Sequence, residues 1–299
     1  MHDNQLTLDQ IKPLADGRVG LAVLGFPINH SLSPHLHNAA LAQLACHDEK
    51  FKNWKYGKVE LAASDLGKAL PKLWDCGYKG LNLTIPHKVE VLPLLSSIDP
   101  AAEIMGAVNT LVWKEDGWHG CNTDGYGLEA GLRESLSVEL ENAQVLILGA
   151  GGAARAAAAQ CLKSRCKKIW LANRSIGRLT EVVHVLSKTF GSKRIQSFAL
   201  DSLPNEVGNI KGLVIINATS LGLKREDLCP IELDGFDPSC KIYDMIYNPA
   251  VTKLLEQAKY GKMSHANGLS MLVHQAARAL ELWTQESVSV SAMYSGVRA

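Results

Sequence analysis

The length, composition and charge of the chain are those of an ordinary globular protein. It has 299 residues, enough for two domains, and 46% of them are hydrophobic against 20% charged, a balance that supports a buried core. The formal net charge is +1, so the chain as a whole does not attract nucleic acid or an anionic membrane. No stretch approaches the roughly 20 apolar residues that a membrane helix requires. These values argue against a polyanion or a membrane as partner, but a local basic cluster could still hold a phosphate.

The cysteines and the N-terminus predict a cytoplasmic protein. Seven cysteines are scattered without a C-x-x-C pair, and an odd number in a chain of this size is typical of reduced thiols rather than of a disulfide framework. The first five residues are polar and contain no apolar segment of the kind found in secretory signals. We expect the polar stretch up to Arg18 to form a short helix or a loose arm, and we assign it no function.

Strand-like and helix-like patterns alternate in the first half of the chain. In chain order we expect a strand over 19–25, a helix over 34–46, a strand over 54–60, a helix over 64–76 and a strand over 80–84. Strands that alternate with helices of this length predict a parallel sheet with helices on its faces. Residues 107–122 break this rhythm, because two strand-like runs, 108–113 and 118–121, flank an Asp-Gly turn that is typical of a β-hairpin.

A second series of strands and helices begins at Gln144. Its expected strands cover 145–148, 168–171, 195–198, 213–217 and 241–244, and its clearest helices cover 153–163 and 178–188. A final helix is predicted over 269–283, where apolar residues recur at helical spacing. The sequence therefore predicts two α/β units joined near residues 122–124, and the last helices could return to the first unit.

A glycine-rich turn follows the first strand of this second series. The segment Gly149-Ala150-Gly151-Gly152-Ala153-Ala154 lies between a strand and a helix and fits the G-x-G-x-x-A pattern of dinucleotide-binding units. Gly149 would permit the tight turn, and Gly151 would let the backbone approach a pyrophosphate. The N–H groups at the start of the helix would then face the phosphates. An ordinary tight turn is the alternative, but the flanking strand and helix favour a nucleotide site.

The end of the next strand indicates which dinucleotide is bound. A site for NAD usually has Asp or Glu there, bonded to the ribose 2′-hydroxyl. This chain instead has Asn173-Arg174-Ser175, with Arg178 one helical turn further on. Two guanidinium groups without a carboxylate suit a 2′-phosphate, because Arg can bind it through paired hydrogen bonds. Two solvated surface arginines would be equally ordinary, but their position favours NADP.

Short polar clusters follow the predicted strands of the first half. They are Asn29 to Pro34, Asn82 to Lys88, Ala107 to Thr110 and Cys121 to Gly125. Ser31 and Ser33 would point the same way in an extended chain and could bond one carboxylate, although Ser33 could equally be a helix N-cap before Pro34. His35 and His37 do not share a helical face, so we expect no metal pair.

Lys88 and Asp124 are candidates for acid–base chemistry. Each has an ordinary structural explanation, as a solvated lysine and as a helix N-cap. Hydride transfer to a ketone, however, needs a proton donor for the developing alkoxide, and oxidation needs the reverse. An ammonium can stabilise the negative oxygen while a neighbouring carboxylate positions it. The carboxylate would also raise the lysine pKa, which burial would oppose, so the sequence leaves open whether Lys88 acts as a base or as an electrostatic stabiliser.

These motifs make the chain similar to the shikimate dehydrogenase family, from about Val19 to Trp283. Eight motifs carry the resemblance, in the order and spacing of the family. They are Ser31 to Pro34, Asn82 to Lys88, Gly106 to Thr110, Asn122 to Gly125, Gly149 to Ala153, Asn173 to Ser175 with Arg178, Asn217 to Gly222, and Asn267 to Gln275.

The resemblance implies two α/β domains, an N-terminal substrate domain and a Rossmann-type dinucleotide-binding domain, with the active site in a cleft between them. The substrate domain would comprise residues 1–123 and 268–299, and the NADP-binding domain residues 124–267. The implied activity is the reversible, NADPH-dependent reduction of 3-dehydroshikimate to shikimate, a step towards chorismate and the aromatic amino acids.

The resemblance also implies roles for individual residues. Lys88 and Asp124 would be the catalytic pair. The substrate carboxylate would be bound by Ser31, Ser33 and Tyr247, and the ring hydroxyls by Thr84, Asn109, Asp124 and Gln275. NADP would be bound by Gly149, Ala150, Gly151, Gly152, Ala153, Asn173, Arg174, Ser175, Arg178, Met245 and Gly268. No metal ion is implied, and both a monomer and a homodimer are compatible with the sequence.

The chain departs from the family pattern at three positions. Ser175 replaces the commoner Thr and keeps the hydroxyl, whereas Asn267 stands where Asp is frequent and Ser270 where Gly is frequent. The last two could alter cofactor contacts or domain closure. The main alternative is a quinate/shikimate dehydrogenase with relaxed substrate or cofactor choice. A non-catalytic sensor is disfavoured, because both Lys88 and Asp124 are present.

Overall fold

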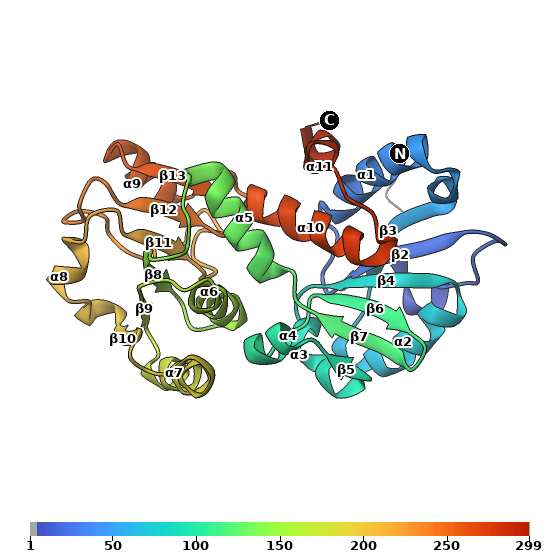
Figure 1. Cartoon of the computed structure of the whole chain (residues 1–299), viewed down its shortest axis with the longest axis horizontal. Coiled ribbons are helices and arrows are strands. Elements are labelled where there is room, and N and C mark those ends of the chain that lie inside the picture. Colours follow the sequence, from blue (N-terminus) through green and yellow to red (C-terminus); the bar gives the residue numbers. More distant parts are fainter. Residues whose placement is uncertain (1–4, 299) are drawn as a thin grey trace. The chain divides into compact units, whose positions relative to one another are not determined.

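The computed structural model describes residues 5–298, which form two compact units (Figure 1). The first unit comprises Met1–Thr123 and Gln275–Ala299, and the second comprises Asp124–His274. Helix α10 (Leu269–Thr284) supplies residues to both units. The second division of the chain therefore lies inside α10, a few residues after the 267/268 boundary expected from the sequence.

The first unit contains a seven-stranded mixed sheet in the order β1-β3-β2-β4-β6-β7-β5. Its strands are β1 (Gln5–Thr7), β2 (Val19–Gly25), β3 (Trp54–Glu60), β4 (Tyr78–Leu83), β5 (Ser97–Ile98), β6 (Thr110–Lys114) and β7 (Gly117–Cys121). The first four in spatial order are parallel, because helical crossovers join them, and β6 runs antiparallel to both β4 and β7. The short β5 pairs in parallel with β7.

Helices cover this sheet and bury its central strands. They are α1 (Ser33–His47), α2 (Leu66–Asp75), α3 (His87–Glu90), α4 (Pro100–Met105) and α11 (Val290–Arg298), with 3-10 helices at Leu8–Gln10, Glu49–Asn53, Ala63–Asp65 and Leu92–Leu94. Leu24 and Leu81 of the sheet form one buried cluster with Leu70 of α2. The Trp283 indole donates a hydrogen bond to the Leu111 carbonyl at 2.9 Å, and α11 packs against α1, so the end of the chain belongs to this unit.

The stretch before Val19 differs from the sequence prediction. It forms the edge strand β1, which pairs with β3, and one 3-10 turn, where we expected a short helix or a loose arm. A three-residue strand has too few positions to show an alternating pattern, and its pairing is a tertiary contact that local propensity does not report. Residues 1–4, part of the polar N-terminus, lie outside the described residues. The strands over 19–25 and 54–60 and the β-hairpin were predicted correctly.

The second unit is built on a six-stranded parallel sheet in the order β10-β9-β8-β11-β12-β13. Its strands are β8 (Gln144–Leu148), β9 (Lys168–Asn173), β10 (Ile195–Ala199), β11 (Val214–Asn217), β12 (Lys241–Asp244) and β13 (Ser264–Asn267). The strand order reverses at β8. In open α/β sheets, ligands bind outside the carboxyl ends of the strands at such a point.

The helices of the second unit are α5 (Asp124–Leu136), α6 (Gly152–Lys163), α7 (Ile176–Phe190), α8 (Asn205–Gly208) and α9 (Lys253–Tyr260), with a 3-10 helix at Leu200–Ser202. Leu146 and Ile242 of the sheet are fully buried in one cluster with Leu254 of α9. The five strands predicted for this unit are present. The sequence did not predict β13, whose residues Ser-His-Ala-Asn are mostly polar. Among residues 5–298, no helix is both long and apolar enough to cross a membrane.

Candidate active site

The glycine turn after β8 has the geometry of a phosphate-binding loop. Gly149 has φ +117°, and a Cβ there would lie 3.0 Å from the Ala218 carbonyl oxygen, so any other residue would be strained. Gly151 is the N-cap of α6, and a Cβ on Gly151 or Gly152 would meet no atom within 4 Å. The N-terminus of α6 therefore faces open space, where its unpaired N–H groups can bind an anion.

A cavity of about 210 Å³ adjoins this turn. Gly149, Ala150 and Gly151 line it together with Asn173, Arg174 and Arg178 from the end of β9 and the start of α7. Among the described residues that line it, none is a carboxylate. Ser175 lies beside the cavity as the N-cap of α7, where its Oγ accepts the Arg178 N–H at 3.5 Å. The glycine turn and the two arginines singled out from the sequence thus line the same cavity.

The loop after β11 forms the other wall of the cavity. Ala218, Thr219, Ser220 and Leu221 line it, with Leu200 and Pro230 as apolar additions. The Oδ1 atom of Asn217 accepts hydrogen bonds from the N–H (3.0 Å) and the Oγ1 (2.7 Å) of Thr219, and Thr219 Oγ1 accepts one from the Leu221 N–H (3.1 Å). These bonds fix the loop, because each turn residue is held by its neighbour.

Met245 and Gly268 lie side by side at the carboxyl ends of β12 and β13. A Cβ on Gly268 would lie 2.2 Å from the Met245 carbonyl oxygen, so this approach requires glycine. The Gly268 N–H donates to the Ile246 carbonyl at 3.1 Å. Neither Met245 nor Gly268 lines the 210 Å³ cavity. They lie at the same edge of the sheet as the cavity, but at its β12 and β13 strands, with β11 between these strands and β8.

Two departures from the family pattern have structural explanations. Ser270 is buried, and its Oγ bonds the Tyr243 hydroxyl at 3.0 Å and the Ser135 hydroxyl at 2.9 Å. Asn267 accepts the Leu269 N–H through Oδ1 at 3.1 Å and donates to the Ala250 carbonyl at 2.9 Å. Both side chains therefore hold the start of α10 in place within the second unit.

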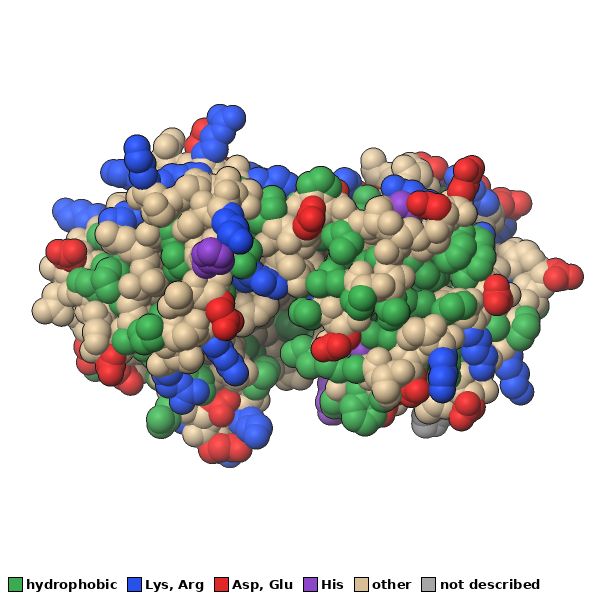
Figure 2. Space-filling view, turned by 90° about the horizontal axis from the view of Figure 1, so that it is seen from below, with side chains coloured by type: hydrophobic (Ala, Val, Ile, Leu, Met, Phe, Trp, Pro, Cys, Tyr) green, Lys and Arg blue, Asp and Glu red, His purple; other side chains and the backbone are tan. Residues whose placement is uncertain are grey.

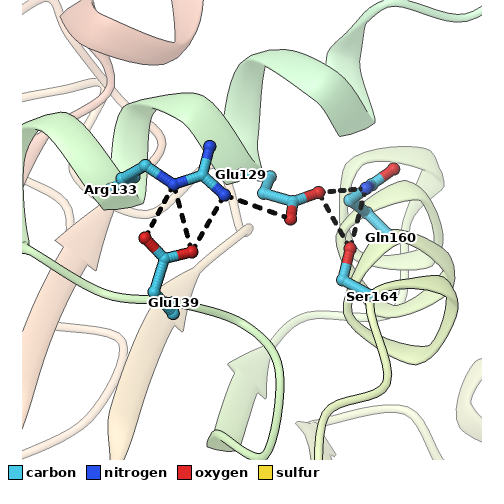
Figure 3. A network of polar contacts seen from close by, with 5 residues as sticks. All are labelled: Glu129, Arg133, Glu139, Gln160 and Ser164. Carbon is cyan, nitrogen blue, oxygen red and sulfur yellow. Dashed lines mark hydrogen bonds and ion pairs between the residues drawn. The ribbon is translucent and has the colours of Figure 1, made fainter.

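Helix α5 is held against α6 by the polar network of Figure 3. Glu129 Oε2 of α5 accepts hydrogen bonds from Nε2 of Gln160 on α6 at 2.6 Å and from Oγ of Ser164, the C-cap of α6, at 2.8 Å. Arg133 lies 3.7 Å from the other Glu129 oxygen and also binds Glu139. Because α5 begins at Asp124 and α6 begins at the glycine turn, this network fixes the helix that carries Asp124 to the helix that faces the cavity.

The first unit holds a continuous network of buried amides and hydroxyls. Asn82 Nδ2 donates to the Asn109 carbonyl at 3.1 Å and to Thr110 Oγ1 at 3.0 Å. Asn109 Nδ2 donates to Thr123 Oγ1 at 3.0 Å and to Gln275 Oε1 at 3.3 Å. Asn109, Thr110 and Thr123 are each at most 2% exposed. The structure thus joins two predicted substrate-binding residues, Asn109 and Gln275, although they are far apart in the sequence.

The serine pair lies at the start of α1, with one correction. Ser33 is the first residue of α1, and the N-cap is Leu32 rather than Ser33. Ser31 Oγ accepts the Ser33 N–H at 3.3 Å. The buried Tyr56 side chain donates from its hydroxyl to Asn82 Oδ1 at 2.7 Å and stacks on the ring of His37, whose Nδ1 bonds the Ser33 carbonyl. Tyr56 therefore links the serine pair to the amide network, a role that its position within a strand did not indicate.

His37 supports the serine pair from within α1. Its Nδ1 bonds the Ser33 carbonyl at 2.8 Å, and its ring stacks on Tyr56 with centroids 3.9 Å apart. Complete burial lowers the pKa of His37 to about 4. Within residues 5–298, no group of three or more His, Cys, Asp or Glu side chains could hold a metal ion.

Thr84 and Lys88 follow strand β4 in the first unit. The Thr84 carbonyl accepts the His87 N–H at 2.8 Å, and the Lys88 carbonyl accepts the Val108 N–H at 2.8 Å. These bonds place the backbone of Lys88 beside the segment that carries Asn109. Asp124 directly follows Thr123 of the amide network and is the first residue of α5. Thr84, Lys88 and Asp124 are all partly buried.

Comparison with known proteins places the chain in a family. The shikimate dehydrogenase substrate-binding domain matches residues 23–111, the shikimate/quinate 5-dehydrogenase model residues 132–223, and the shikimate 5′-dehydrogenase C-terminal domain residues 268–297. The NADP(+) shikimate dehydrogenase of Geobacter metallireducens is 38% identical over 88% of this chain and 90% of its own length. The chain belongs to the shikimate dehydrogenase family.

Two crystal structures extend the similarity to three dimensions. The Thermus thermophilus shikimate 5-dehydrogenase in complex with NADP(H) and shikimate has a TM-score of 0.81 at 29% identity, covering 94% of this chain and 98% of its own. The Corynebacterium glutamicum quinate dehydrogenase in complex with NAD has a TM-score of 0.82 at 26% identity, covering 94% and 99%. The family fold, with an N-terminal substrate domain and a Rossmann-type dinucleotide-binding domain, is thus that of this chain.

The three matched ranges of this shikimate dehydrogenase family member cover most, but not all, of the predicted site residues. The serine pair, Lys88, the glycine turn and Gln275 lie inside them, whereas Asp124, Met245 and Tyr247 lie outside. Sequence reasoning also missed the cavity residues Leu200 and Pro230. No local sequence pattern could have identified these two residues. They line the cavity only because the folded loops place them beside it, and their own sequence neighbours do not indicate this.

Proposed function

We propose that the chain catalyses the reversible reduction of 3-dehydroshikimate to shikimate with NADPH, a step in the synthesis of chorismate and the aromatic amino acids. The observation that carries the proposal is the cavity in which the glycine turn meets Arg174 and Arg178. In a member of the shikimate dehydrogenase family, this cavity supplies the cofactor half of the reaction. The NADP(+) shikimate dehydrogenases among the relatives support the substrate half.

The residues around the cavity fit NADP. The N–H groups at the start of α6 would bind the pyrophosphate, since nothing lies within 4 Å of a Cβ on Gly151 or Gly152. Arg174 and Arg178 would bind the 2′-phosphate, with Asn173 and Ser175 beside them. Ala150 and Ala153 complete the turn. Met245 and Gly268, further along the same sheet edge, would contact the nicotinamide part.

The substrate would be held mainly by the first unit. Ser31 and Ser33 would bind its carboxylate with Tyr247. Thr84, Asn109 and Gln275 would bind ring hydroxyls together with Asp124. The hydrogen bond between Asn109 and Gln275 supports this assignment, because it gathers amide groups from two distant segments. The substrate domain would comprise residues 1–123 and 268–299 and the NADP-binding domain residues 124–267.

Lys88 and Asp124 would carry the proton chemistry. Bound NADPH supplies the hydride. The Lys88 ammonium would stabilise the developing alkoxide and give it a proton, and the Asp124 carboxylate would orient the ammonium and bind the same hydroxyl. Asp124 would owe its position to Thr123, whose N–H donates to Asn109 Oδ1 at 2.8 Å, and to the network that holds α5 against α6.

A quinate/shikimate dehydrogenase is the alternative function. The similar Corynebacterium quinate dehydrogenase was solved with NAD, whereas Arg174 and Arg178 favour NADP in this chain. The deciding experiment measures kcat/KM for shikimate and quinate, each with NADP⁺ and NAD⁺. We expect shikimate with NADP⁺ to give the highest value. A clear preference for quinate would overturn the proposed substrate, and no turnover with either would overturn the function.

We further propose a cytoplasmic enzyme that acts as a monomer or homodimer, with no nucleic-acid or membrane partner. Figure 2 shows acidic and basic side chains interspersed on the visible face of each unit, together with exposed hydrophobic side chains on the first unit. A mixed surface of this kind supports neither polyanion nor membrane binding. All seven cysteines are free thiols, which suits a reducing compartment.

A further inference from the structure

One buried carboxylate in the second unit has no role in the chemistry described so far. Asp244, the last residue of β12, is 0% exposed. Its Oδ1 accepts hydrogen bonds from Asn217 Nδ2 and from the Ile246 N–H, each at 3.0 Å. Its Oδ2 accepts one from Thr252 Oγ1 at 2.6 Å. This carboxylate therefore joins the end of β11, the loop after β12 and the start of α9.

The partners of Asp244 are arranged for the ionised form. The amide of Asn217 and the backbone N–H of Ile246 can only donate at these atoms, and the Thr252 hydroxyl is free to donate as well. Burial raises the pKa of Asp244, and the three donated bonds oppose that rise because each stabilises the anion. Three donors on one buried carboxylate favour its ionised form, in which it would be a fixed negative charge rather than a solvated one.

The sheet topology puts Asp244 on the side of the strand reversal where the nicotinamide half of a bound cofactor would lie. A dinucleotide lies across the carboxyl edge of the sheet at the point of strand reversal, with one nucleotide on each side. The reversal occurs at β8, and Arg174 and Arg178 stand on the β9 side. The 2′-phosphate end would therefore lie over β9, and the other nucleotide would extend over β11, β12 and β13. Asn217 and Asp244 end the first two of these strands.

We propose that Asp244 favours the oxidised over the reduced form of the bound cofactor. The oxidised nicotinamide ring carries a positive charge and the reduced ring does not, whereas the rest of the molecule is the same in both forms. A fixed negative charge in a buried setting therefore stabilises one form selectively. The inference rests on the proposed function only in taking NADP as the ligand, and it concerns the cofactor equilibrium rather than the identity of the substrate.

The test compares the affinities of NADP⁺ and NADPH by isothermal titration calorimetry, without substrate, in wild-type protein and in Asp244→Asn. Asparagine keeps the shape, since Oδ1 can accept the same two bonds and Nδ2 can donate to Thr252 Oγ1, but it removes the charge. We expect NADP⁺ affinity to fall by roughly fivefold, because the oxidised ring loses its attraction to the buried charge. NADPH affinity should stay nearly constant, so the ratio of the two dissociation constants changes.

Thr252→Val is the matched control. It removes the 2.6 Å hydrogen bond to Asp244 Oδ2 but leaves the carboxylate in place. It should change both affinities by the same factor, as any purely structural disturbance would. Equal weakening of the two forms in Asp244→Asn would overturn the proposal and leave Asp244 as a positioning residue. If Asp244→Asn does not fold, Asp244→Ser removes the charge while leaving room for water to bridge the donors. The ratio of the NADP⁺ and NADPH dissociation constants in that variant then tests the proposal in the same way.

This outcome is distinct from failure of the proposed function. Wild-type protein that bound neither form of NADP would contradict the proposed function itself. Wild-type protein that bound both forms, with a ratio that Asp244→Asn left unchanged, would contradict only the electrostatic role of Asp244.

Discussion

The two units present their candidate binding groups in different ways. In the second unit, the turn at Gly149 and the open N-terminus of α6 present backbone groups to the cavity, and the exposed Arg174 and Arg178 line its rim. In the first unit, the candidate residues Asn109 and Gln275 belong to a largely buried network in which each amide or hydroxyl also bonds another. Recognition by backbone groups depends on a few neighbouring residues, whereas in a buried network a change in one side chain affects the hydrogen bonds of the others.

This difference determines how far a substitution should act. A change at the rim of the cavity should alter cofactor binding and little else, because its side chains are solvated and make few bonds to the rest of the unit. A change inside the amide network should leave buried partners unsatisfied and so should affect stability as well as binding. The contrast between local effects at the cavity and coupled effects in the amide network can be tested by four measurements. They are the rate of the reaction, the stability of the fold, the choice of cofactor and the affinity for the cofactor.

The largest effect should come from Lys88→Ala. We expect kcat to fall by about a thousandfold, within the range typical of a lost general acid–base group, while the dissociation constant for shikimate changes much less. Steady-state kinetics and calorimetry of shikimate binding measure the two quantities. Equal losses in both would make Lys88 a binding group only. Lys88→Arg sharpens the result, because Arg keeps the charge but does not deprotonate; activity retained in it would identify an electrostatic stabiliser rather than a base.

The second effect is a pH dependence of stability that originates in the first unit. Burial lowers the pKa of His37 from 6.5 to about 4, so below pH 6.5 the unfolded chain binds a proton that the folded chain does not. Stability is therefore fully present above pH 6.5 and is lost as the pH falls towards 4, by about 3 kcal/mol in all. In His37→Gln, urea unfolding at pH 7 and pH 5 should show a smaller difference than in wild type. The exposed His184→Gln is the control and should leave the pH dependence as it was. If His37→Gln lost as much stability as wild type between pH 7 and pH 5, His37 would not be the source of that loss.

The third effect concerns cofactor choice at the rim of the cavity. Arg174→Asp should lower kcat/KM for NADP⁺ relative to NAD⁺ by about thirtyfold, because a charge-assisted pair with the 2′-phosphate is replaced by repulsion. The thermal unfolding midpoint should not change, since Arg174 is exposed. Arg225→Asp makes the same change of charge at an exposed residue outside the cavity lining and should leave the selectivity intact. Selectivity that survives Arg174→Asp would contradict the NADP assignment at this position.

The contrast between the units also explains what the sequence could predict. Buried parallel strands are continuous apolar runs, as in 145–148, and the glycine turn after this run is a local pattern with a steric cause, so both were found from the sequence. The edge strands β1 and β13 were missed because they are short or polar and exist through pairing with a neighbour. Tyr56 and Asp244 were missed for a related reason. Their partners lie in other segments, Asn82 for one and Asn217 and Thr252 for the other, and no spacing within a single element reveals them.

The smallest effect tests the backbone side of the comparison directly. Gly151 has φ −88°, which alanine adopts readily, and its Cβ would meet no atom within 4 Å. Gly151→Ala should therefore fold with unchanged stability, yet its methyl group would enter the space where the pyrophosphate approaches the N-terminus of α6. We expect NADP⁺ affinity to fall about tenfold, as measured by calorimetry. Gly177→Ala is the control, because its Cβ also meets open space but lies in α7 outside the cavity lining. A Gly151→Ala protein that bound NADP⁺ as tightly as wild type would mean that the phosphates do not approach this turn, and the backbone could no longer be regarded as the recognising surface.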